Sequence, residues 1–231
     1  MSSLILIPGL AGDATMWQPQ LQALTAWAPC VTDVQTKHET IPDMASALLA
    51  SHAGPLVLCG ASMGGMIAME AVRQAPERVA GLALLGTDPG AERPEMRLLR
   101  EAAIALFAEG RVAEVIEPNV ALAFHPSNAR RRELVDAYLD FVLRAGSGQL
   151  IRQNRAVIAR PDATLHLGAV RCPTLVVAAR EDAIMPVEML EELARGIPGS
   201  RFEIIERCGH SSMLERPTHV SKLLIDWLGN G

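Results

Sequence analysis

Six short apolar stretches are spaced along the chain, and each is long enough for one buried strand. They occupy residues 4–7, 31–34, 56–59, 79–85, 172–178 and 201–205. Between most of them the apolar residues recur at helical spacing, over residues 16–27, 41–52, 63–75, 186–196 and 220–227. Strands that are apolar throughout and alternate with helices predict a doubly wound α/β fold, in which helices cover both faces of a mostly parallel six-stranded sheet. Residues 201–205 alternate instead, which predicts a more exposed edge strand.

The pattern changes after Asp88, where the helical spacing continues without a clear strand. Residues 93–160 read as several successive helices, with a break at Gly146-Ser147-Gly148 and a further helix over 150–158. We therefore expect an α/β core formed by residues 1–90 and 165–231, with residues 91–164 inserted as a helical cap over one rim of the sheet. The alternative is a set of ordinary sheet-flanking helices, and the absence of strands between the helices argues against it.

The segment from residue 56 to residue 72 carries the most specific motif. A buried strand leads into Gly60-Ala61-Ser62-Met63-Gly64, which fits G-x-S-x-G, and a helical pattern follows. A sharp strand-to-helix turn around a serine is the nucleophile elbow, and its tight backbone gives Gly60 and Gly64 a steric reason to be glycine. The alternative is a glycine-rich loop whose serine only caps the helix.

Three chemically suited side chains follow different predicted strands. Parallel sheets bind ligands at the carboxyl ends of their strands, and Ser62, Asp182 and His210 all follow such ends. A serine hydroxyl needs a base within hydrogen-bond reach, and the base needs a third group that fixes its tautomer. His210 would take the Ser62 proton and Asp182 would hold His210. The backbone N–H groups of Leu10 and Met63 are the expected donors to a developing oxyanion.

The stretches LILIPGLAGDATMW, CGASMGG, AAREDAIMP and RCGHSSMLERP resemble the α/β-hydrolase superfamily, and the resemblance extends over essentially the whole chain. The chain is similar to small capped esterase-like members. The resemblance implies the superfamily fold without its first two strands. It also implies Ser62 as nucleophile, Asp182 as acid, His210 as base, and Leu10 with Met63 as the oxyanion hole. The segment IRQNRAVIARPD resembles the end of the cap in small esterases of this group.

Two features depart from the pattern of the superfamily. The oxyanion loop usually reads His-Gly, and here it reads Pro8-Gly9. The Leu10 amide is retained, but the sequence does not indicate which residues support the loop from behind. Some members place the acid after the preceding strand, which would be Asp88 in this chain. We favour Asp182, because Asp88 stands before Pro89 and is typical of a turn.

Composition narrows the classes of function. The 231 residues carry a formal net charge of -5, and 49% are apolar. A nucleic-acid-binding protein would need a basic face, and the only basic cluster is at residues 130–132, which is more typical of a solvated helix surface. The four cysteines have no disulfide spacing, and no signal peptide or membrane span is recognisable, so we expect a cytoplasmic protein that does not associate with membranes. The oligomeric state stays open, with a homodimer as one alternative.

The remaining polar residues suggest no second chemistry. Five other histidines lack partners at metal-ligand spacing: His38, His52, His125, His166 and His219. We expect Glu215 to cap the last helix and Cys208 to be a packing residue, although its place two residues before His210 leaves a role in tuning the base open. No metal or cofactor is expected.

The leading functional hypothesis is a hydrolase that cleaves a carboxylic ester through an acyl-Ser62 intermediate. The same machinery could act on a lactone, a thioester or a carbon–carbon bond, or transfer the acyl group to an alcohol, because one fold hosts many reactions. A non-catalytic ligand receptor is the alternative from another class. The Leu, Ile, Val, Ala, Phe and Met content of the cap suggests a small-molecule substrate with an apolar acyl group.

Overall fold

A computed structural model describes residues 2–229, and one six-stranded sheet lies at its centre. The strands are β1 (Ser3–Ile7), β2 (Cys30–Val31), β3 (Leu56–Ala61), β4 (Val79–Leu85), β5 (Thr174–Ala179) and β6 (Arg201–Ile205). Their order is β2-β1-β3-β4-β5-β6, and every neighbouring pair is parallel. The predicted doubly wound α/β fold is confirmed, and β6 lies at the edge, as its alternating sequence predicts.

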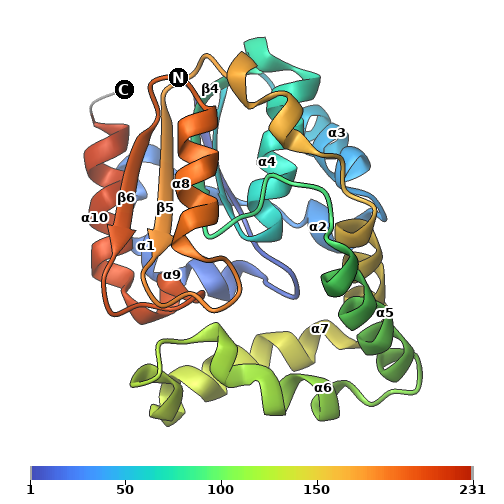
Figure 1. Ribbon diagram of the computed structural model, residues 1–231. Helices are drawn as coiled ribbons and strands as arrows, with labels where there is room; N and C mark the ends of the chain where they lie inside the picture. The colour runs from blue at the N-terminus through green and yellow to red at the C-terminus, as the bar shows by residue number, and fades with distance from the viewer. Residues whose placement is uncertain (1, 230–231) are drawn as a thin grey trace.

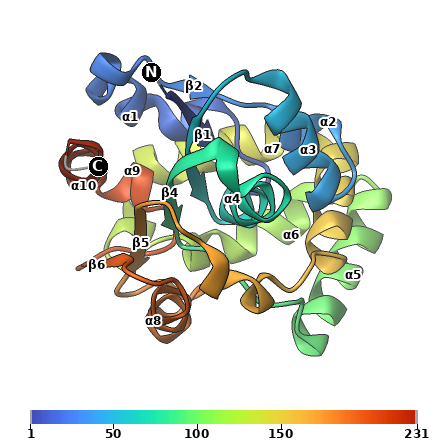
Figure 2. The ribbon, with the colours of Figure 1, turned by 90° about the horizontal axis from the view of Figure 1, so that it is seen from above.

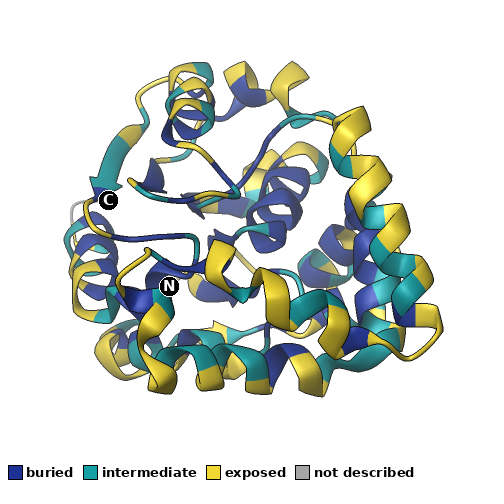
Figure 3. Ribbon diagram, turned by 60° about the horizontal axis from the view of Figure 1, so that its bottom comes forward, coloured by how far each residue is buried: buried dark blue, intermediate teal, exposed yellow. Residues whose placement is uncertain are grey.

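Alternating side chains of the buried strands build two cores, one on each face of the sheet. Ile5 and Ile7 belong to one core, while Leu4 and Leu6 belong to the other. The first core is covered by α3 (Ile41–Ser51), α4 (Met63–Gln74) and α8 (Val187–Gly196), and the second by α1 (Gln18–Ala23) and α10 (Pro217–Leu228). Figure 2 shows the two groups of helices on opposite sides of the strands. In Figure 3 the central strands of the sheet are mostly dark blue, and yellow lies on the outward surfaces of the helices.

Residues 91–164 form helices and short turns between β4 and β5. The helices are α5 (Pro94–Ala108), α6 (Val112–Asn119) and α7 (Arg132–Ile158). The predicted break is confirmed, because Gly146 interrupts α7 with a φ of 70°. Figure 1 shows α6 and α7 lying beyond the ends toward which the arrows of β5 and β6 point. Phe107, Phe141 and Leu150 of this segment pack with Ala11 from the loop after β1, so the helices contact the rim directly.

Two predicted elements differ from the structure near the N-terminus. The stretch predicted as a strand over 31–34 pairs with β1 only at Cys30 and Val31, and Val34 instead begins the short helix α2 (Val34–Lys37). A short apolar run cannot distinguish these outcomes, because a buried valine suits both. The single helix expected within residues 16–27 is three short pieces. Pro19 lies in the first turn of α1, and Ala28 ends the last piece with a φ of 45°.

Short elements complete the chain around these helices and strands. The four-residue helix α9 (Ser212–Glu215) lies between β6 and α10, and several 3₁₀ turns connect the other elements. Between residues 2 and 229, no helix combines the length and the apolar character that a membrane crossing requires.

Candidate active site

Ser62 occupies a strained turn between the end of β3 and the start of α4. Its φ of 52° and ψ of -119° are rare for a residue with a side chain. Hydrogen bonds hold the turn on both sides: the Ser62 amide donates to the Leu85 carbonyl at 2.9 Å, and Thr87 Oγ1 donates to the Ser62 carbonyl at 2.7 Å. The strain is therefore maintained by β4 and its following loop, and it presents the hydroxyl above the end of the sheet.

The two glycines of the motif allow the close backbone approach on which this turn depends. A Cβ atom at Gly60 would overlap the carbonyl of Gly64 one turn ahead. A Cβ atom at Gly64 would overlap the carbonyl of Ile7 at the end of β1. Neither obstacle is a flexible side chain that could move aside, so the structure confirms the steric reason inferred from the sequence.

The structure brings Ser62, His210 and Asp182 together. His210 Nε2 lies 3.1 Å from Ser62 Oγ, and His210 Nδ1 lies 2.7 Å from Asp182 Oδ2. The second oxygen of Asp182, Oδ1, accepts the amides of Ile184 and Met185, each at 2.8 Å. Because the carboxylate accepts from Nδ1, the tautomer that fits is Nδ1–H, which leaves the Nε2 lone pair facing the serine hydroxyl.

The surroundings of His210 change its basicity. The imidazole is 15% exposed and the Asp182 side chain is fully buried. Burial on its own lowers the pKa of His210, but the charge of Asp182, its hydrogen bond and the charge of Glu215 outweigh that effect. The pKa of His210 is therefore raised above its ordinary value, which makes the ring a stronger base than a free histidine.

Asp88, the alternative acid, has a different set of partners. Its Oδ2 accepts from Arg160 Nη2 at 2.9 Å, and its Oδ1 accepts the amide of Gly90 at 2.8 Å. The second bond is the local turn predicted from the sequence around Pro89. The geometry thus places Asp182 on His210 and Asp88 on Arg160.

Leu10 and Met63, the predicted oxyanion-hole residues, line the same cavity as Ser62. Met63 is the first residue of α4, so its N–H lacks an intrahelical acceptor. The loop that carries Leu10 is held from behind by the fully buried Gln153 of α7. Gln153 Oε1 accepts the Ala11 amide at 2.8 Å, and Gln153 Nε2 donates to the Gln35 carbonyl at 2.9 Å. A side chain from the 91–164 segment therefore supports the oxyanion loop. The sequence alone did not indicate which residues lie behind this loop.

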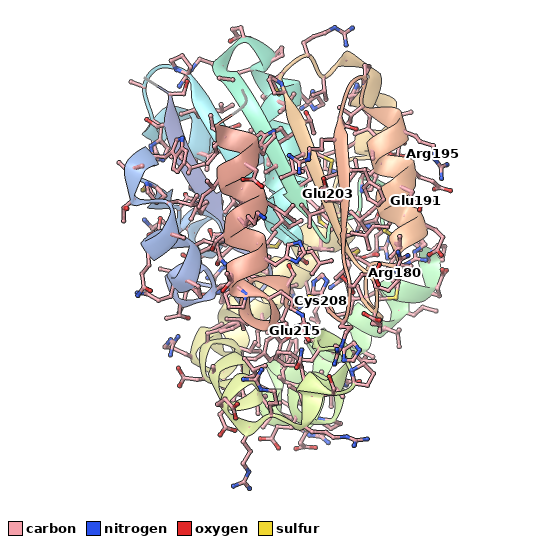
Figure 4. All side chains as sticks on the ribbon, turned by 90° about the vertical axis from the view of Figure 1, so that its left-hand side faces the viewer. Arg180, Glu191, Arg195, Glu203, Cys208 and Glu215 are labelled. Atoms are coloured by element: carbon pink, nitrogen blue, oxygen red, sulfur yellow. The ribbon has the colours of Figure 1, made fainter. Side chains whose placement is uncertain are left out.

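Glu215 was expected to cap the last helix, and this prediction is wrong. It is a buried side chain of α9 that joins two loops. Its Oε1 accepts the Gly209 amide at 2.7 Å, while its Oε2 accepts the His125 amide and Asn128 Nδ2, each at 2.8 Å. Figure 4 shows Glu215 at the boundary between α9 and the helices of the 91–164 segment. Glu215 therefore fixes the residue before His210 to that segment.

A cavity of about 170 Å³ opens onto Ser62 and His210. Apolar side chains from both parts of the fold line most of it: Leu10, Met16, Met63, Met66, Phe141, Val157, Ile184 and Met185. Tyr138 and Arg100 also line it, and Tyr138 packs edge-to-face on Phe141 with 5.1 Å between ring centroids. The cavity can hold a small, largely apolar group next to the serine hydroxyl.

Comparison with known proteins identifies the family to which these features belong. The profile described as "alpha/beta hydrolase fold" matches residues 36–217, which is most of the chain. The chain belongs to the α/β-hydrolase fold family. The family resemblance inferred from the sequence motifs is therefore confirmed.

Individual members of the family that resemble this chain carry several activities in their names. A thermophilic esterase from Thermogutta terrifontis has 29% identity and a TM-score of 0.92, covering 100% of this chain and 90% of the esterase. A pimeloyl-[acyl-carrier protein] methyl ester esterase from Aromatoleum aromaticum is 27% identical, with 96% of each chain covered. A 2-hydroxy-6-oxononadienedioate/2-hydroxy-6-oxononatrienedioate hydrolase from Cupriavidus pinatubonensis is 29% identical over 75% of this chain and 62% of its own length.

Sequence reasoning missed the roles of three polar residues that line the cavity or support the loops of the site. Gln153 accepts a hydrogen bond from an amide 142 positions away, and Glu215 accepts from amides 6 and 90 positions away. Arg100 reaches the cavity from the exposed helix α5. No local pattern marks them, although Gln153 lies in the segment that resembles the end of an esterase cap. Among residues 2–229, no group of three metal-binding side chains comes together.

Proposed function

We propose that this α/β-hydrolase fold protein is a serine hydrolase that cleaves a carboxylic ester through an acyl-Ser62 intermediate. The observation that carries the proposal is the hydrogen-bonded series Ser62 Oγ, His210 and Asp182, with distances of 3.1 Å and 2.7 Å. A serine held in this way by a base and an acid is suited to nucleophilic attack on a carbonyl carbon. The esterase relatives support the choice of an ester as the substrate.

Acylation begins when Ser62 Oγ attacks the ester carbonyl and His210 Nε2 takes the hydroxyl proton. The carbonyl oxygen becomes an oxyanion, and the amides of Leu10 and Met63 are the donors proposed to stabilise it. Collapse of the tetrahedral intermediate breaks the bond to the alkoxy group, and the imidazolium gives its proton to the leaving oxygen. Asp182 stabilises the imidazolium through the Nδ1 hydrogen bond.

Deacylation repeats the sequence with water as the nucleophile. His210 takes a proton from water, the hydroxide oxygen attacks the acyl carbonyl, and the proton returns to Ser62 Oγ as the acid is released. The apolar lining of the cavity supports a small-molecule substrate whose acyl group is largely apolar.

Turnover of p-nitrophenyl butyrate by matched serine variants tests the proposal. We expect Ser62→Ala to lower kcat by at least about a thousandfold, because the nucleophile is lost. The control is Ser51→Ala, since the Ser51 hydroxyl is exposed on α3 and bonds only the carbonyl of its own helix turn. The control should keep the wild-type rate. Equal rates in wild type and Ser62→Ala would refute the proposal.

A second candidate is hydrolysis of a bond other than an ester. The observation that favours it is the 29% identity to a hydrolase named for a hydroxy-oxo diacid. A panel of p-nitrophenyl ester, lactone, thioester and diketone substrates separates the candidates, because all would depend on Ser62 but differ in kcat/KM. The ester proposal requires the ester to have the highest kcat/KM of the panel.

A further inference from the structure

Arg100 is a charged side chain in a cavity that is otherwise mostly apolar. It lies on α5, its side chain is 19% exposed, and it lines the same cavity as Ser62 and His210. Tyr138, on α7, lines the cavity as well. Figure 1 shows α5 and α7 side by side, and each of these helices carries one of the two residues. Placing a cation among apolar groups costs free energy, which calls for an account of what the guanidinium contacts.

Two of the three guanidinium nitrogens of Arg100 have protein acceptors. Nε donates to Glu92 Oε2 at 2.6 Å, and Nη1 donates to Asn154 Oδ1 at 2.9 Å. Asn154 is itself oriented, because its Nδ2 donates to the Leu150 carbonyl at 2.8 Å. Within residues 2–229 the third nitrogen, Nη2, has no protein acceptor. The Arg100 side chain is therefore fixed in place, and its Nη2 group is available to donate to a ligand.

The charges around Arg100 are balanced. Glu92 pairs with Arg100 and also with Arg160 Nη1 at 3.0 Å, and Arg160 Nη2 pairs with Asp88 at 2.9 Å. Two guanidinium groups thus face two carboxylates. The spare Nη2 offers hydrogen-bonding capacity rather than a surplus positive charge, so an oxygen acceptor of either charge suits it.

Tyr138 supplies a second donor to the same cavity. Burial raises the pKa of Tyr138, so its hydroxyl keeps the proton, and no hydrogen-bond partner for this hydroxyl occurs among the described residues. Arg100 and Tyr138 line one small cavity, and Arg100 Nη2 and the Tyr138 hydroxyl both lack protein acceptors among the described residues. Two such donor groups suit an oxygen atom of a ligand.

We propose that Arg100 and Tyr138 bind an oxygen acceptor at the far end of the acyl group, so that the preferred substrates are esters of oxo acids or dicarboxylic acids. This inference rests on the proposed ester hydrolysis and narrows its substrate class. The middle of the acyl chain contacts the apolar lining, and the distal carbonyl or carboxylate oxygen accepts from Arg100. A site built to bond an oxygen discriminates against an analogue that lacks it, because the donors are then left unpaired.

The test compares p-nitrophenyl hexanoate with p-nitrophenyl 5-oxohexanoate and mono-p-nitrophenyl adipate. We expect the wild type to prefer at least one acceptor-bearing ester by about tenfold or more in kcat/KM, as one hydrogen bond to a charged group allows. The neutral ketone and the carboxylate separate the two sources of the acceptor. A wild-type enzyme that favours the hexanoate, or treats all three alike, would overturn the inference.

Arg100→Met should remove the preference, so that the ratio of kcat/KM values approaches one, while Arg100→Lys should retain part of it. The fold should tolerate the change, because Glu92 keeps Arg160 as a partner. The matched control is Arg97→Met on the same helix. Its side chain is 59% exposed and pairs with Glu101, so this variant should keep the wild-type preference. Retention of the preference in Arg100→Met also overturns the inference.

A binding measurement separates failure of this inference from failure of the proposed function. In Ser62→Ala, which cannot form the acyl-enzyme, monomethyl adipate or methyl 5-oxohexanoate should bind about tenfold more tightly than methyl hexanoate by calorimetry. Addition of Arg100→Met should abolish that difference. Ester turnover that does not depend on Ser62 contradicts the proposed function alone, whereas equal affinities contradict the assignment of Arg100 alone.

Discussion

The substitution Glu215→Gln tests whether Glu215 joins the His210 loop to the 91–164 segment. Glutamine keeps the shape but offers one acceptor oxygen in place of two. The best orientation of the amide places its oxygen toward His125 and Asn128 and its NH₂ group toward the Gly209 N–H. One buried donor is then unsatisfied, which costs about 1–3 kcal/mol.

The other two hydrogen bonds also weaken, because they lose the charge of the carboxylate. A hydrogen bond to a charged group contributes about 1.5–3 kcal/mol, against about 0.5–1.5 kcal/mol for a neutral one. Relief from burying a charge offsets part of this loss. The free energy of unfolding should therefore fall by about 2–4 kcal/mol, which corresponds to a decrease in Tm of roughly 4–16 °C for a chain of this size.

The same substitution should change catalysis through His210. The charge of Glu215 contributes to the raised pKa of His210, so its removal should lower the midpoint of the acid limb of kcat/KM. Loosening Gly209 should also reduce kcat, because small displacements of a catalytic base are costly. The shift in the pH profile distinguishes this role from a purely structural one.

Urea unfolding, differential scanning calorimetry and the pH profile of ester turnover make up the assay. The control is Glu206→Gln, since the Glu206 side chain is 63% exposed and pairs only with Arg180 at the surface. Its unfolding free energy should lie within about 0.5 kcal/mol of wild type. A Glu215→Gln protein with wild-type stability and an unmoved acid limb would show that this reasoning is wrong.

Three further predictions concern the serine turn, the acid of the site and the burial of the cysteines. Gly64→Ala should destabilise the fold by more than about 4 kcal/mol, because its Cβ atom would overlap a carbonyl of β1; urea unfolding measures this. Asp182→Asn should lower kcat by about ten-thousandfold. Because the pKa of His210 is raised, wild-type kcat/KM should rise with pH through a midpoint above about 6.5. In Asp182→Asn this midpoint should move to lower pH. Iodoacetamide should alkylate the exposed Cys30 and spare Cys59, whose pKa burial raises, as mass spectrometry can show.

Each of these predictions has a control and a contradicting outcome. Gly168→Ala has open space around the new methyl group and should be nearly neutral, so equal effects at the two glycines would refute the steric account. Asp162→Asn alters an exposed turn away from the site and should keep the pH profile. Denatured protein should be alkylated at every cysteine. Rapid alkylation of Cys59 in the native protein would contradict its burial.

Elements bounded by clear local signals were predictable from sequence alone. The strands β4 and β6 have the bounds predicted from the sequence, because Pro76 and Gly199 stand two or three residues before them and interrupt the preceding elements. Ser62 was recognisable because G-x-S-x-G states a backbone requirement that only a few residue types satisfy. The break at Gly146 was predictable for the same reason.

Residues whose partners are distant in sequence were not predictable. Glu215 stands two residues before a proline and looks locally like a helix cap, but its acceptor oxygens serve residues about ninety positions away. Gln153 supports a loop 142 positions distant, and nothing around it in the sequence indicates this. Val34 was assigned to a strand because burial alone does not separate a strand from a short helix. Tertiary contacts decided all three.

The most direct test of the central claim is to locate the acyl group during turnover. Wild-type protein reacting with p-nitrophenyl butyrate is quenched in acid, digested and analysed by tandem mass spectrometry. We predict a butyryl adduct on the peptide that contains Ser62, at the Ser62 side chain, and its absence from Ser62→Ala. Steady ester hydrolysis with no adduct on Ser62, or with the adduct on another residue, would contradict the account.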